Sequence, residues 1–203
     1  SENSYNNELI KFDYTSVNNG YGHNFLFKKN LSNMNVFFSI NNKHMDNYSI
    51  PHGVLYEEGA EKTMISNSDH KNQNTSFGLS FPREWGYFGI SFENTDGIYG
   101  IPYHAEEEGE HEEEEEEHRL FTKNETETYT VKGKFNSIPF FNSMDYSYRN
   151  SNSFLKEHEE DGSASLNSNS NSFAFGFNLD DESYEKRLLL EYNHTKSPMT
   201  GAY

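Results

Sequence analysis

The sequence predicts an all-β fold, an antiparallel up-and-down transmembrane β-barrel of which this chain forms a part. Only 33% of the 203 residues are hydrophobic, yet 16% are aromatic, whereas disordered chains are poor in aromatic residues. Short segments alternate between aromatic or aliphatic residues and polar residues, which is typical of strands with two different faces. Membrane barrels alternate lipid-facing and lumen-facing residues in this way.

About nine strands follow from this alternation. In residues 9–16, for example, Ile10, Phe12 and Tyr14 alternate with charged or polar neighbours. The same period of two recurs along the chain. The expected strands cover residues 9–16, 22–29, 34–40, 75–81, 87–93, 125–135, 144–149, 173–177 and 184–193.

The lengths of the connections favour a barrel. Tight turns, at residues 31–33, 82–86, 136–142 and 180–182, alternate with long polar stretches at residues 44–74, 96–123 and 150–171. Outer-membrane barrels have short periplasmic turns and long extracellular loops, with every second connection on the same side. We therefore expect residues 1–203 to form a partial barrel domain, a piece of a longer protein. A soluble β-sandwich remains the alternative, since its strands show the same alternation.

A histidine-spaced acidic stretch lies within the middle long loop. Ten of the residues between positions 106 and 117 are Glu, and His104, His111 and His118 punctuate them. Burying even one unpaired charge costs several kcal/mol, so this stretch must be solvated. We expect an acidic extracellular loop over about residues 96–123.

This loop has the residue types that bind divalent cations. Zinc prefers imidazole with carboxylate as a partner, whereas all-oxygen sites suit calcium, magnesium or manganese. Histidines spaced by seven lie about 10 Å apart on a helix, so each would recruit nearby carboxylates. The alternative is a solvated charge run that only keeps other molecules away. The candidate metal ligands are His104, Glu107, Glu108, His111, Glu114, Glu115 and His118.

Composition excludes several classes of function. A net charge of −17 is opposite to what a nucleic-acid partner requires and favours cations. The chain has no cysteine, so it has neither disulfides nor thiolate metal sites. It shows no nucleophile beside a base and no phosphate-binding glycine loop. We therefore expect no enzymatic activity and no required cofactor, with a divalent metal ion only as the transported ligand.

Several motifs, taken in order, resemble the barrel of TonB-dependent outer-membrane receptors, and most closely their zinc-uptake subgroup. They cover most of the chain from about residue 46 onward. They comprise NYSIP at 47–51, NS at 67–68, GLS at 78–80, GYFGIS at 86–91, YGIP at 99–102 before the acidic loop, DY at 145–146, EEDG at 159–162 and EKRLLLEY at 185–192. The chain departs from that subgroup in two features. Glu replaces most histidines of the loop, and Tyr148 stands where a histidine is usual.

The resemblance implies an outer-membrane transporter of a Gram-negative bacterium. It would import a metal ion, zinc favoured, or a metal chelate, and the acidic loop would gather cations at its mouth. Its partners would be outer-membrane lipid and the TonB complex, the latter through parts that this chain does not contain. A siderophore or haem receptor of the same fold and a soluble secreted cation-binding β-domain are the alternatives.

Overall fold

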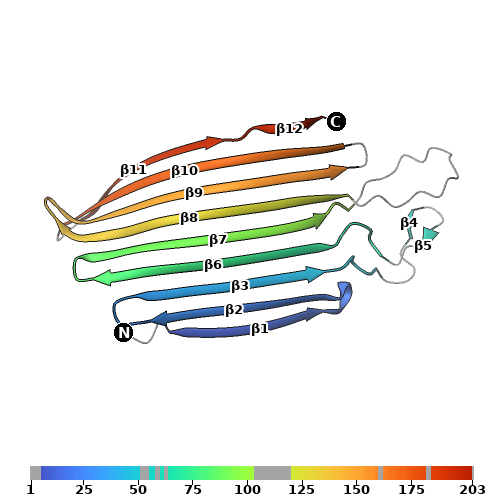
Figure 1. Cartoon of the computed structure of the whole chain (residues 1–203), viewed down its shortest axis with the longest axis horizontal. Coiled ribbons are helices and arrows are strands. Elements are labelled where there is room, and N and C mark those ends of the chain that lie inside the picture. Colours follow the sequence, from blue (N-terminus) through green and yellow to red (C-terminus); the bar gives the residue numbers. More distant parts are fainter. Residues whose placement is uncertain are drawn as a thin grey trace.

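The computed structural model describes residues 6–50, 55–57, 60–61, 64–102, 120–159, 162–181 and 184–202. One large antiparallel sheet contains nearly all of them, in the order β1-β2-β3-β6-β7-β8-β9-β10-β11, with β12 beside β10. Figure 1 shows the strands lying side by side in chain order. The predicted all-β, up-and-down architecture is therefore confirmed.

The strands differ widely in length. A 3-10 turn at Ser16–Asn18 joins the first two strands, and the small hairpin β4–β5 lies in the connection between β3 and β6. The strands are β1 (Asn7–Thr15), β2 (Gly20–Asn30), β3 (Asn35–Met45), β4 (Leu55–Glu57), β5 (Ala60–Glu61), β6 (His70–Arg83), β7 (Gly86–Gly100), β8 (Phe121–Ile138), β9 (Phe141–Glu159), β10 (Gly162–Asp181), β11 (Tyr184–Lys196) and β12 (Met199–Ala202). No described helix is long and apolar enough to cross a membrane.

The predicted long loop at residues 150–171 is wrong. These residues continue β9 to Glu159 and begin β10 at Gly162, so only two residues separate the strands. Asn and Ser have low strand propensity, but here their side chains bond across the strands: Asn150 Nδ2 donates to Asn171 Oδ1 at 2.9 Å. Cross-strand pairs of this kind stabilise a sheet and override the local preference.

The other two long connections are shorter than predicted. The strand β6 already begins at His70, so the first connection spans residues 46–69. The strand β7 extends to Gly100 and β8 begins at Phe121, so the second connection spans residues 101–120 rather than 96–123. Both leave the same end of the sheet, which we call the loop end (Figure 1). The opposite end, with the β2–β3, β6–β7, β8–β9 and β10–β11 turns, is the turn end.

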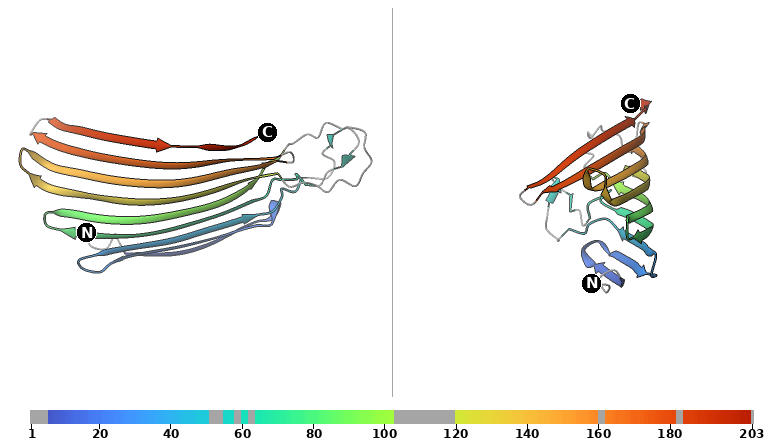
Figure 2. Two further views of the ribbon diagram at one scale, coloured as in Figure 1. Left: turned by 45° about the horizontal axis from the view of Figure 1, so that its top comes forward. Right: turned by 90° about the vertical axis from the view of Figure 1, so that its left-hand side faces the viewer.

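The sheet is a single curved layer with β1 and β11 at its edges (Figure 2). Its pleat sends alternate side chains to opposite faces, and the strand register defines which residues share a face. Among the described residues, only Leu120 and Ala164 are buried apolar side chains. The fold therefore lacks an ordinary hydrophobic core in the part of the chain that the structure describes.

One face, which we call the banded face, carries an apolar band near the turn end. The register aligns Leu79 with Ile90, and Ile90 with Val131. No Asp, Glu, Lys or Arg lies within the band on β3 and on β6 to β10, and the charged residues Glu8, Lys29 and Lys186 border it on β1, β2 and β11. Its residues are Ile10, Phe12, Tyr14, Phe25, Phe27, Val36, Phe38, Ile40, Phe77, Leu79, Phe81, Phe88, Ile90, Phe92, Tyr129, Val131, Phe135, Met144, Tyr146, Tyr148, Phe173, Phe175, Phe177, Leu188, Leu190 and Tyr192.

Candidate functional site

The opposite face, the polar face, carries hydroxyl, amide and charged side chains. Thr128 Oγ1 lies 3.0 Å from Ser151 Oγ, and Ser170 Oγ lies 3.1 Å from Thr195 Oγ1. These pairs join β8 to β9 and β10 to β11. Since the hydroxyls satisfy one another across the strands, this face is suited to contact with water or polar protein.

An arginine crosses one strand on the polar face. The Arg187 guanidinium nitrogen Nη2 lies 3.6 Å from Asp145 Oδ2, although β10 separates their strands. It passes over Gly176, where an added Cβ would lie 2.9 Å from Nη2. Asn178 Nδ2 also donates to Asp145 Oδ2, at 3.2 Å. A glycine in the middle strand thus leaves room for a link across three strands.

The predicted metal ligands cannot be placed. All of them fall in residues 103–119, which lie outside the described residues: His104, Glu107, Glu108, His111, Glu114, Glu115 and His118. In the part of the chain that the structure does describe, no group of three or more His, Asp and Glu could hold a metal ion. The metal site therefore stays a prediction.

The structure does define where the acidic stretch is attached. Before it, the Gly100 N–H donates to the Asp69 carbonyl at 2.9 Å, and the Ile101 N–H donates to the Leu120 carbonyl at 3.1 Å. Only glycine fits at position 100, because an added Cβ would lie 2.3 Å from the Asn67 carbonyl oxygen. The stretch therefore leaves and rejoins the sheet at one point of the loop end, against the first long connection.

His70 lies beside this attachment on the polar face. Its ring stacks on Tyr99, with centroids 5.1 Å apart and planes at 14°, and Asn72 Nδ2 donates to the Tyr99 hydroxyl at 2.9 Å. Partial burial and the nearby Lys43 ammonium lower the pKa of His70. Asp69 opposes this effect but does not reverse it, so the site favours neutral imidazole, the form that ligates metals.

The other loop-end histidines are held separately. His44 Nε2 lies 3.2 Å from Asp46 Oδ1, and its ring lies 5.2 Å from that of Tyr21. His158 contacts the ring of Phe121 at 5.2 Å. The strand register places His44 and His70 on opposite faces, so these two side chains do not converge on one ion.

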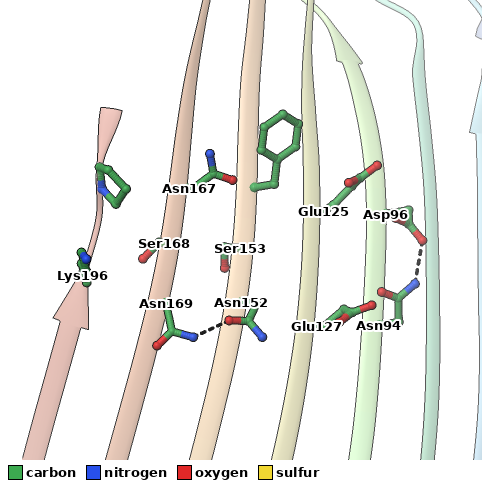
Figure 3. A pocket seen from close by; sticks show the side chains of 12 residues that line it. Asn94, Asp96, Glu125, Glu127, Asn152, Ser153, Asn167, Ser168, Asn169 and Lys196 are labelled. Carbon is green, nitrogen blue, oxygen red and sulfur yellow. Dashed lines mark hydrogen bonds between the residues drawn. The ribbon is translucent and has the colours of Figure 1, made fainter. Parts of the chain in front are cut away.

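A shallow groove of about 630 Å³ hollows the banded face beyond the band, toward the loop end (Figure 3). Figure 3 shows Asn152, Asn167 and Asn169 on one side of it, and Asp96, Glu125 and Glu127 together with Asn94 on the other, all from adjacent strands. The sequence prediction missed this groove, although the period of two in NTD at 94–96 and ETE at 125–127 would place these acids on one face. The residues that line it are Asn94, Asp96, Glu125, Glu127, Asn152, Ser153, Phe154, Asn167, Ser168, Asn169, Lys196 and Pro198.

Comparison with known proteins gives a likeness of fold. No protein-family model and no curated protein matches this chain. A solved structure, the FrpB iron transporter from Neisseria meningitidis (F3-3 variant), superposes with a TM-score of 0.69 at 10% sequence identity. The alignment covers 89% of this chain and 29% of that one. The chain thus shares the fold of part of that structure and spans less than a third of its length.

Proposed function

We propose that this chain is a wall segment of an outer-membrane β-barrel transporter that takes up a metal ion or a metal chelate. The observation that carries the proposal is the chemical difference between the two faces of one sheet. The banded face is apolar and uncharged along its band, and the polar face behind it bonds through hydroxyl, amide and charged groups. A membrane barrel requires this pairing, because one face meets lipid and the other meets the lumen.

The dimensions of the band support a membrane. From Tyr129 to Phe135 the strand rises by about 20 Å at ~3.3 Å per residue, and the apolar band of membrane barrels is about 25 Å tall. Its side chains are exposed or only half-buried in the isolated sheet, with Phe12 at 77% and Ile10 at 64%. Burying such a side chain stabilises a protein by about 1.5–3 kcal/mol, so the band needs an apolar surrounding that lipid supplies.

Aromatic residues border the band at both ends, as in membrane barrels. At the turn end, Trp85 stacks on Phe135 with ring centroids 5.3 Å apart, and Phe140 is 92% exposed. At the other border, the Tyr148 hydroxyl donates to Asn171 Oδ1 at 3.1 Å. Tyr and Trp favour membrane interfaces because one end of the ring is apolar and the other can bond to water.

A soluble sandwich is less well supported. In a sandwich a second sheet covers the apolar face, and no second layer covers the banded face in the described part of the chain. The likeness of fold to an iron transporter points in the same direction. It concerns the fold alone, so uptake powered through a TonB complex rests on the sequence resemblance.

For the ligand, we propose a divalent cation, with zinc favoured, gathered by the acidic loop. The support is chemical: Glu and His at residues 104–118 are cation ligands, and the net charge of −17 attracts cations to the mouth. A chelated metal, such as a siderophore or haem, is the second candidate. It is favoured by the superposition on an iron transporter.

Metal accumulation in metal-starved cells tests both levels of the proposal. The strains compared carry the complete gene, a knockout, or the complete gene lacking residues 106–117. Reduced zinc uptake in the knockout and partly reduced uptake in the deletion are expected. Normal zinc uptake with loss of iron-chelate or haem uptake would replace the ligand but keep the transporter. Unchanged uptake of all three would overturn the transporter itself.

A further inference from the structure

The strands β8, β9 and β10 extend well past the apolar band. From Asn150 to Glu159, β9 continues for about 30 Å at ~3.3 Å per residue beyond the last band position, Tyr148. The groove lies in this region, on the same face as the band. If the band sits in hydrocarbon as proposed above, the groove faces the headgroups of the outer leaflet, which extend the membrane by about 5–7 Å on each side.

The lining of the groove is rich in amides that both donate and accept hydrogen bonds. Asn171 Nδ2 donates to Asn169 Oδ1 at 2.9 Å, and Asn169 Nδ2 donates to Asn152 Oδ1. This amide ladder fixes the orientation of its members, and Figure 3 shows its bond between Asn169 and Asn152. The Asn167 side chain is exposed and makes no hydrogen bond within the described residues, so its donor and acceptor are available to a ligand.

The opposite side of the groove supplies carboxylates that accept hydrogen bonds. Asp96 Oδ2 accepts from Asn94 Nδ2 at 2.7 Å, and Glu125 pairs with Lys123. Glu127 is exposed and forms no ion pair among the described residues. With Lys196 as the only cation in the lining, the groove is net negative and disfavours phosphate groups.

Phe154 and Pro198 add apolar surface to the lining. A saccharide ring carries hydroxyls at its edge and C–H groups on its faces. Its hydroxyls would hydrogen-bond to the amides and carboxylates while its C–H face packs on Phe154 and Pro198. The volume of about 630 Å³ lies within the range of roughly 300–1,000 Å³ that is usual for small-ligand sites. A hydroxyl can both donate and accept hydrogen bonds, as an amide side chain does. The amides of the groove can therefore use both their N–H and C=O groups with a saccharide, but only their N–H groups with an anion that only accepts.

We infer that this groove binds the uncharged saccharide headgroup of a glycolipid that lies beside the barrel. The inference rests on the proposed membrane location of the band but not on the transported ligand. The banded face would then contact the membrane in two ways, through its apolar band with the hydrocarbon and through its groove with one kind of lipid headgroup. The lipid would hold the long strand extensions against the membrane surface.

The test uses the full-length protein in phosphatidylethanolamine nanodiscs doped with digalactosyl diacylglycerol, a lipid with a neutral disaccharide headgroup. Native mass spectrometry after partial removal of lipid counts the glycolipids that stay bound. We expect the glycolipid to be enriched about tenfold over phosphatidylethanolamine, which corresponds to about 1.4 kcal/mol, because its hydroxyls form hydrogen bonds in the groove that the phosphatidylethanolamine headgroup does not form. The doubly substituted Asn152→Ala, Asn169→Ala protein should lose this enrichment.

Two further variants separate binding from folding. Asn167→Leu leaves the amide ladder intact and should still reduce the enrichment. Asn124→Ala lies beside Glu125 but on the polar face and should retain it. Equal retention of both lipids by the wild type, or a preference for phosphatidylglycerol with calcium, would overturn the inference while leaving the transporter proposal standing. Failure of the protein to enter nanodiscs would overturn both.

Discussion

The two halves of β8, β9 and β10 form the same sheet from opposite kinds of residues. Near the turn end these strands carry Tyr129, Tyr146 and Phe175 on the banded face, and near the loop end the same face carries Glu127, Asn152 and Asn169. Pairing continues without a bulge along the 17 aligned positions that begin at Gly162↔Glu159. Continuous strands therefore do not require continuous hydrophobicity, since polar side chains can bond across them.

The two halves of these strands also differ in what they require from their surroundings. The turn-end half has an apolar face without partners among the described residues, so it depends on a surrounding medium. In the loop-end half, by contrast, many polar side chains bond to one another within the sheet, as in the amide ladder from Asn171 to Asn152. We therefore expect substitutions in the turn-end half to act through the membrane, and those in the loop-end half to act through local contacts.

The largest effect is expected from a charge in the band. Ile90→Lys places an ammonium among Leu79 and Val131, and Lys at the bilayer midplane costs about 2–4 kcal/mol in membrane barrels. Ser91→Lys is the matched control, because the next residue lies on the polar face. Heat-modifiable migration of the protein from outer-membrane fractions measures folding. Equal yields of the two variants would contradict the assignment of the faces.

A glycine at the turn end gives the next largest effect. Gly86 has φ +141°, and an added Cβ would lie 1.8 Å from the Lys134 carbonyl oxygen. Gly86→Ala should therefore cost more than the roughly 1–3 kcal/mol typical of backbone strain alone. The control is Gly78→Ala, whose Cβ would lie 3.4 Å from its nearest neighbours. Urea unfolding of the refolded protein should show a lower midpoint for Gly86→Ala only.

The link across three strands has a smaller expected effect. Arg187→Ala removes the contact with Asp145, and exposed pairs of this kind contribute about 0.2–1 kcal/mol. The Arg187 side chain is 58% exposed, so the loss should fall near the lower end. Lys186→Ala, one residue away and on the banded face, controls for the loss of a positive charge. A loss of unfolding free energy that is no greater for Arg187→Ala would show that the link does not stabilise the sheet.

Sequence reasoning predicted the turn-end half well because period-two alternation and hydrophobicity coincide there. Residues 173–177, for example, alternate Phe with small residues and lie in β10. It failed at residues 150–171, because a run of Ser and Asn resembles a loop until its partners across the strands are known. The groove was missed for the same reason, since Asp96 and Asn152 meet only through the strand register.

The smallest effect is expected from pH at the loop end, through His70. Its pKa is lowered in the folded protein, chiefly by burial and then by Lys43. The unfolded chain therefore binds a proton at a higher pH than the folded one, so His70 is neutral in both states only above the ordinary histidine pKa of about 6.5. As the pH falls below that value, protonation favours the unfolded state, and the loss of stability is complete once the pH is below the folded pKa.

His70→Gln should flatten this part of the profile of unfolding free energy against pH. The difference between wild type and variant should change below about pH 6.5 and stay constant above it. Because Tyr99 stacks on His70 next to the acidic stretch, NMR titration of the His70 ring can show whether divalent cations at the stretch alter its protonation. A His70 pKa at or above the ordinary value would contradict the neutral, partly buried imidazole.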